Sequence, residues 1–239
     1  MKLELHVHTR FSKDSLLCFW PLYLKCRLLK ISAIAITEHN NINGGLAFKE
    51  FCEKHGNHIL VIVGEEIFSS EGEIIGLYLK ENIRGGMSAG ESINEIKRQG
   101  GVVYVPHPYD DKRHNTVLME SAISDYKEAI DCIEVHNGRN ISIEYDKKQR
   151  AIAEKYNLTP IIGSDAHTWI EIGRNYLKVN HLPNSSENFR IAIRDAVFQP
   201  RKSIKISHQI TKVAKTAQLI KEGKFNELYR TVIRKIKRG

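Results

Sequence analysis

Short runs of β-branched and aliphatic residues alternate along the chain with longer segments whose apolar residues recur at helical spacing. Most of the short runs are continuously apolar, which is typical of strands buried on both faces. The expected strands are Leu3–Val7, Ala33–Thr37, Ile59–Val63, Ile74–Leu79, Val102–Val105, Ile130–Val135 and Pro160–Ile162. This alternation of strand and helix predicts a parallel α/β sheet or barrel.

Helix boundary signals lie between several of these runs. Pro21 suits the first turn of a helix, because its missing N–H needs no partner there. A second helix is expected over Gly45–His55 and is closed by Gly56. Ser88 is a suitable N-cap for a third helix, which ends at Gly100.

The charge of the chain is concentrated at its C-terminal end. The composition, 41% hydrophobic and 27% charged, is that of a globular protein and excludes disordered and fibrous classes. Residues 201–239 contain twelve Lys or Arg and two Glu, a net charge of +10. Because the whole chain carries +8, residues 1–200 carry −2. We therefore expect one domain over 1–200 and a basic amphipathic helical extension over 201–239.

The extension has apolar residues on one helical face and basic residues on the other. The apolar positions are Phe225, Leu228, Tyr229, Val232, Ile233 and Ile236, preceded by a shorter stripe of Ile210, Val213, Ala217 and Ile220. Three interpretations remain open. The segment is a helical hairpin packed on the domain, a surface for nucleic acid, or a reversible contact with an anionic membrane.

The sequence predicts a reducing cytoplasmic location. No apolar run approaches the roughly 20 residues that cross a bilayer. The first residues, MKLELHVH, have no apolar signal core. The four cysteines, Cys18, Cys26, Cys52 and Cys132, have the spacing of neither a metal knuckle nor a disulfide framework.

Histidines and carboxylates follow the expected strands at the points where the strands end. The groups are His6-Val7-His8, Glu38-His39, Gly64-Glu65-Glu66, His107-Pro108 and Gly163-Ser164-Asp165-Ala166-His167, and Glu73 begins another strand. In parallel α/β folds the site lies outside the carboxyl ends of the strands. Imidazoles and carboxylates are ligands for Zn, Mn or Fe. These groups exceed the needs of one ion, so we expect two or three divalent ions.

These motifs, together with Asp14 and Glu134-Val135-His136-Asn137, resemble the PHP (polymerase and histidinol phosphatase) superfamily of metal-dependent phosphoesterases. The resemblance covers about residues 1–180. It implies a distorted (β/α)7 barrel with a trinuclear metal centre at its C-terminal mouth. Carried over by motif, the first ion is held by His6, His8, Glu66 and Asp165. The second is held by His107 and the bridging Glu66, and the third by Asp14, His39 and His167.

The chain departs from the family pattern at two positions. Relatives have Asp-His where this chain has Glu38-His39, and we expect Glu38 to support the ligand beside it rather than to bind metal. Many relatives place a further histidine ligand where this chain has Glu73. We include Glu73 as a ligand of the second ion, and an oxygen in place of a nitrogen favours Mn or Fe over Zn.

The resemblance implies hydrolysis of a phosphoester, a small phosphorylated metabolite or a nucleotide, by metal-activated hydroxide. We expect Asp165 and His107 to be essential for catalysis. Asn137, Arg139 and Arg174 lie beside the motifs and are candidates for binding the substrate.

Two other functions are weighed against this one. The alternative is a nuclease or phosphodiesterase that acts on nucleic-acid ends, with the extension 201–239 binding the polyanion. A non-catalytic scaffold is disfavoured because every expected ligand position retains a residue able to bind metal.

Overall fold

The computed structural model describes residues 1–204 except 57 and 114, together with 206, 207, 209–211, 213 and 216. The strands are β1 (Lys2–Val7), β2 (Ala33–His39), β3 (Leu60–Ser69), β4 (Gly72–Leu77), β5 (Val102–Val105), β6 (Cys132–Asn137), β7 (Pro160–Gly163), β8 (Tyr176–Lys178) and β9 (Val197–Gln199). The helices are α1 (Phe19–Leu29), α2 (Asn43–Lys54), α3 (Ala89–Arg98), α4 (Glu120–Tyr126), α5 (Ile143–Lys155) and α6 (Ser186–Arg194). Each expected strand is present, but β3 ends at Ser69 instead of Val63; the other bounds agree with the prediction within two residues.

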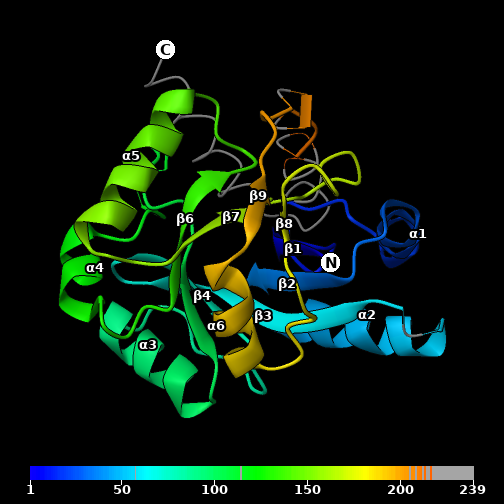
Figure 1. The fold of residues 1–239 in the computed structure, drawn as a ribbon, viewed down its shortest axis with the longest axis horizontal. Helices are drawn as coiled ribbons and strands as arrows, with labels where there is room; N and C mark the ends of the chain where they lie inside the picture. Colours follow the sequence, from blue (N-terminus) through cyan, green and yellow to red (C-terminus); the bar gives the residue numbers. More distant parts are fainter. Residues whose placement is uncertain are drawn as a thin grey trace.

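The strands form a nearly closed barrel. The sheet order is β7-β6-β5-β4-β3-β2-β1-β8-β9. Closure occurs where the segment after β7 meets β1, since Ser164 N donates to Leu5 O and His8 N donates to Ala166 O. Helices surround this sheet, with α1 and α2 on one side and α3, α4 and α5 on the other (Figure 1). The prediction of a distorted (β/α)7 barrel is confirmed.

One strand runs against the expected parallel order. β4 is antiparallel to both β3 and β5, because a tight turn joins β3 directly to β4 without an intervening helix. The first residues of β4 therefore lie at the same end of the barrel as the last residues of its neighbours. This reversal brings Glu73, at the start of β4, to the barrel mouth.

A β-bulge in β1 decides which face its histidines occupy. Glu4 pairs with Ile34 and Val7 pairs with Ile36, so three residues of β1 span two residues of β2. One extra residue moves all later side chains to the opposite face of a strand. Val7 consequently packs in the cluster beneath α1, which includes Ile34 and Ile36. His6 and His8, on either side of Val7, face the barrel interior.

The apolar residues divide into two clusters. The larger joins the barrel interior to α3, α4 and α6, and the smaller lies between α1, α2 and the strands β1–β3. The helix predicted after Ser88 is observed, with a capping box between Ser88 and Glu91. These two layers hold the strand ends fixed with respect to one another.

Most of the C-terminal extension lies outside the described residues, including the predicted stripe from Phe225 to Ile236. The described residues between 206 and 216 are helical. Within them, Ser207 and Thr211 are buried whereas Val213, a member of the shorter apolar stripe, is exposed. Among the described residues, none of the helices has the length and apolar character needed to cross a membrane.

Gly72 tests whether the β3–β4 turn is essential to the fold. Its φ is +125°, and an added Cβ would lie 2.5 Å from Leu118 Cα and Val117 O. We expect Gly72→Ala to lower the free energy of unfolding by roughly 3 kcal/mol, measured by urea denaturation. Gly100→Ala is the matched control, because φ is +73° there and no atom lies within 4 Å of the added Cβ. Equal losses in the two variants would contradict the close contact at Gly72.

Candidate metal centre

Glu66 lies at the centre of the barrel mouth, between two pairs of histidines. Its Oε1 is 3.3 Å from His6 Nε2 and 3.2 Å from His107 Nε2. Its Oε2 is 3.3 Å from His8 Nε2 and 2.9 Å from His39 Nδ1. A carboxylate with each oxygen facing a different pair of imidazoles has the geometry of a bridging ligand. Glu65, the neighbouring carboxylate, points away and accepts from Ile83 N.

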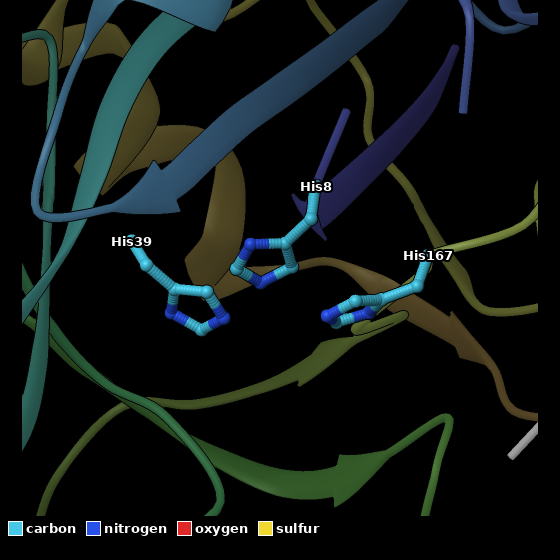
Figure 2. A group of neighbouring side chains, drawn as sticks. All are labelled: His8, His39 and His167. Atoms are coloured by element: carbon cyan, nitrogen blue, oxygen red, sulfur yellow. The ribbon is translucent and has the colours of Figure 1, made fainter. Parts of the chain in front are cut away.

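Three imidazoles and Asp14 form one part of the centre. Figure 2 shows His8, His39 and His167 converging from three different segments of the chain. The ring centroid of His8 is 4.5 Å from that of His39 and 4.4 Å from that of His167. Asp14 Oδ1 is 3.6 Å from both His39 Nε2 and His167 Nε2. Asp14, His39 and His167 could together hold one ion, with His8 beside them.

Asp165 and Glu73 complete the set of predicted ligands on opposite sides of Glu66. Asp165 Oδ1 is 3.8 Å from both His6 Nε2 and His8 Nε2. Glu73 Oε2 is 3.4 Å from His107 Nε2. The candidate metal-binding triads are His6-His8-Asp165, His6-Glu66-His107, His8-His39-His167 and His39-Glu66-Glu73. The structure thus brings together all nine residues proposed as ligands from the sequence.

The imidazoles are oriented in the manner of metal ligands. His6 Nδ1 lies 2.8 Å from Glu134 Oε1, and His167 Nδ1 lies 2.9 Å from Asp165 O. Within the described part of the chain, the buried Nε2 atoms of His6 and His8 have no hydrogen-bond partner. A metal-binding histidine commonly donates its other ring N–H to a carboxylate or carbonyl, which leaves one nitrogen for the ion. These nitrogens fit a divalent cation.

Three of the candidate ligands have backbone conformations that non-glycine residues rarely adopt. The φ values are +62° for His6, +27° for His107 and +48° for Asp165. Such conformations cost of order 1–3 kcal/mol each and persist where the surrounding structure enforces them. Here the bulge in β1 and the hydrogen bonds at the mouth hold the three side chains toward Glu66.

The buried carboxylates of the centre would be stabilised by additional positive charge. Burial opposes protonation of His6, but Glu66 and Asp165 raise its pKa well above the usual value. Burial also opposes ionisation of Glu66, but His6 and His39 hold its pKa well below the usual range. Burial and the charge of Glu66 raise the pKa of Glu73 to about 7. A divalent cation would supply the positive charge that protonated imidazoles otherwise provide.

Glu38 lies behind the ligands rather than among them. Its carboxylate accepts from Thr9 N at 2.9 Å and from the hydroxyls of Thr9 and Ser12. Ser12 Oγ in turn is 3.3 Å from His8 Nδ1 and accepts from His39 N at 3.2 Å. Glu38 therefore fixes the loop that orients both histidines, a supporting position of the kind expected from the sequence.

Glu134 is a functional residue that the sequence reasoning missed. Regular strand alternation would place Glu134 and Asn137 on opposite faces, but Asn137 Nδ2 donates to Glu134 Oε2 at 2.8 Å. A bulge between Glu134 and His136 inserts one residue in β6 and reverses the later positions. Glu134 also accepts from His107 N at 2.7 Å, so one carboxylate orients two ligands. The only sequence signal was its place in the Glu-Val-His-Asn motif.

Arg113 is the second residue that the sequence did not reveal. It lies in the loop between β5 and α4, and its Nη2 is 2.5 Å from Asp165 Oδ2. Asp110 Oδ2 accepts from Arg113 Nε at 3.2 Å and so holds the guanidinium over the mouth. Despite burial, Arg113 holds the pKa of Asp165 well below its usual range. No periodicity or motif marks a residue in such a loop.

The three residues proposed as substrate contacts each form hydrogen bonds within the chain. Asn137 is buried, and its side chain also accepts from Arg139 N at 2.9 Å. Arg139 Nη2 donates to Thr211 Oγ1 at 2.8 Å, and Arg174 Nη2 donates to Lys202 O at 3.0 Å. Both arginines therefore contact the start of the C-terminal extension.

Comparison with known proteins identifies the class to which this barrel and its histidine–carboxylate cluster belong. The family model of the PHP domain matches residues 4–233, and the chain belongs to this family of hydrolases. The uncharacterized protein MJ0417 of Methanocaldococcus jannaschii is 34% identical over 184 residues, which are 76% of this chain and 72% of that protein. The predicted membership of the PHP superfamily is thereby confirmed.

Solved structures share the same fold. A two-domain protein of Bacteroides vulgatus that contains a predicted PHP-like metal-dependent phosphoesterase has a TM-score of 0.65 and 24% identity. The match covers 84% of this chain and 65% of that one, just under two thirds of its length. A Bifidobacterium adolescentis protein provisionally assigned as a metal-dependent phosphoesterase has a TM-score of 0.59 and 17% identity, with 82% and 96% covered. Both structures confirm the predicted fold.

Glu134 can be tested through the metal content of the protein. We expect protein purified without chelator to contain more than one equivalent of divalent metal, measured by elemental analysis. Glu134→Gln should lower metal affinity by about 10- to 100-fold, because the carboxylate no longer fixes His6. Glu144→Gln, an exposed carboxylate on α5, is the control. Unchanged metal affinity in Glu134→Gln would show that this contact does not organise the centre.

Proposed function

We propose that this protein hydrolyses a phosphoester of a small phosphorylated metabolite or nucleotide with a di- or trinuclear metal centre. The observation that supports this proposal is the position of Glu66, whose two oxygens face separate pairs of histidines. Such a bridging carboxylate suits a cluster of ions rather than a single ion. The oxygen ligand at Glu73 favours Mn or Fe over Zn.

The residues of the mouth have separate roles in this proposal. When bound, the divalent ions would lower the pKa of water and offset the charge of the phosphoryl group. His6, His8, Glu66 and Asp165 would hold one ion. His107 and Glu73, together with Glu66, would hold a second. Asp14, His39 and His167 would hold the third. Asp165 and His107 are the two whose loss should be most damaging.

Arg113 is the cation best placed to bind the phosphoryl group. Its guanidinium presents several N–H donors in a planar arrangement that matches phosphate oxygens. It reaches the centre from a loop outside the barrel and contacts Asp165 without being one of the metal ligands. We therefore add Arg113 to Asn137, Arg139 and Arg174 as a substrate-binding residue and give it precedence.

A nuclease or phosphodiesterase is the second candidate, and one observation favours it. The basic extension begins beside the mouth, where Arg139 contacts Thr211 and Arg174 contacts Lys202. A net charge of +10 over 201–239 would attract a polyanionic substrate to this rim.

The four cysteines are all free, which supports our proposal of a reducing, cytoplasmic location.

The proposed hydrolysis is tested by a metal-supplemented screen of phosphomonoesters, cyclic and linear phosphodiesters and short oligonucleotides. For any substrate found, Asp165→Asn and His107→Ala should each lower kcat/KM by roughly 100-fold or more, since even outer-shell changes cost up to about 100-fold. His58→Ala, which removes an exposed histidine just before β3 and outside the cluster, should retain full activity. Near wild-type activity of Asp165→Asn, with an unchanged circular dichroism spectrum, would contradict the mechanism.

The role of Arg113 is tested by Arg113→Met. A charge-assisted hydrogen bond to phosphate contributes about 1.5–3 kcal/mol, so kcat/KM should fall about 10- to 100-fold. The affinity for inorganic phosphate should fall in parallel, which separates substrate binding from a structural defect. Arg98→Met, which removes an exposed arginine on α3, serves as the control. A normal phosphate affinity in Arg113→Met would exclude Arg113 from the binding site.

A further inference from the structure

Helix α1 exposes apolar residues on the face where a surface helix normally carries polar ones. It buries Leu22, Tyr23 and Cys26 against the barrel. Its outer face carries Trp20, Leu24 and Leu28, which are 52%, 57% and 80% exposed. Figure 1 shows α1 at the periphery of the molecule, on the same side as α2. A helix that is apolar on its outer face has a surface to bury.

Residues from two neighbouring segments extend this surface. Leu16, just before α1, is exposed, and its N–H donates to His167 O at 2.9 Å. Trp169 is 61% exposed, and Lys25 of α1 donates to Trp169 O and lies 4.8 Å from the centre of its ring. We call Leu16, Trp20, Leu24, Leu28 and Trp169 the α1 ridge. The ridge runs from the outer end of α1 toward the rim of the barrel mouth.

The charged residues of α1 and of the segments that flank it are all positive. Residues 15–37 contain no Asp or Glu, and their only charged residues are Lys25, Arg27 and Lys30. Arg27 and Lys30 are exposed beside Leu28. Helix α1 therefore combines tryptophan and leucine with cations and carries no acid of its own, which is the composition of a helix that lies in the interface of an anionic bilayer.

We propose that the α1 ridge docks reversibly on an anionic lipid bilayer, with Trp20, Leu24, Leu28 and Trp169 entering the interface. A second copy of the chain is a poorer occupant, since pairing two ridges would bring Arg27 and Lys30 of both copies together. The basic extension 201–239 is a poorer occupant for the same reason, because its Lys and Arg would lie beside these cations. An anionic bilayer offers acyl chains to the apolar residues of the ridge and negative headgroups to its cations.

The two tryptophans make the proposal directly measurable. Trp20 and Trp169 are the only tryptophans in the chain, and both belong to the α1 ridge. The full-length protein is mixed with vesicles of phosphatidylcholine alone or with added phosphatidylserine. We expect a blue shift of the emission and quenching by brominated lipid with the anionic vesicles only, and reversal of both by salt. Cosedimentation should give the same dependence on lipid charge.

Substitutions separate the contribution of apolar insertion to membrane binding from that of electrostatic attraction. Leu24→Ser with Leu28→Ser should abolish the blue shift, and Arg27→Gln with Lys30→Gln should weaken binding to anionic vesicles by roughly 30-fold. Ile191→Ser, which removes an exposed apolar residue on α6, should have no effect. Because all these side chains are exposed, unchanged circular dichroism is expected in every variant.

Four outcomes would overturn the proposal. One is an absence of binding by the wild-type protein, and another is equal binding to neutral vesicles. A blue emission maximum before vesicles are added would show that another part of the chain covers the α1 ridge. A dimer that is lost in the Leu24→Ser, Leu28→Ser variant, measured by light scattering, would make a second copy the occupant.

Discussion

The carboxylate of Glu66 is the group around which the mouth of the barrel is arranged. Four imidazoles approach its two oxygens, and the remaining carboxylates lie outside this ring. Burial makes the arrangement costly unless positive charge is close at hand, because a charge loses its hydration inside a protein. The lowered pKa of Glu66 and the raised pKa of His6 are two consequences of the same imbalance, namely buried negative charge with too little positive charge beside it. Binding of divalent cations would relieve it.

Local irregularities in the strands make this convergence possible. The extra residue in β1 turns His6 and His8 inward, the extra residue in β6 turns Asn137 toward Glu134, and the reversed β4 brings Glu73 to the mouth. Each irregularity interrupts a regular pattern of pairing, and each lies at or beside a residue of the site. Strain and bulges of this kind concentrate where the position of a side chain has functional value.

The positively charged residues have different environments at the rim. Arg113 contacts Asp165 from a loop, whereas Arg139 and Arg174 contact the beginning of the C-terminal extension. Lys202 and Thr211, among the described residues of the extension, therefore contact arginines of the domain.

The sequence by itself determined the barrel, its family and the nine candidate ligands, because buried strands and their terminal histidines leave a local pattern of residues. It did not determine which face Glu134 occupies, since strand alternation fails at a bulge that only pairing with β7 reveals. Arg113 was equally hidden, because its partner Asp165 is 52 residues away along the chain. The tertiary structure decided these points, and also the exposure of the α1 ridge, because each depends on contacts between segments that are distant in sequence.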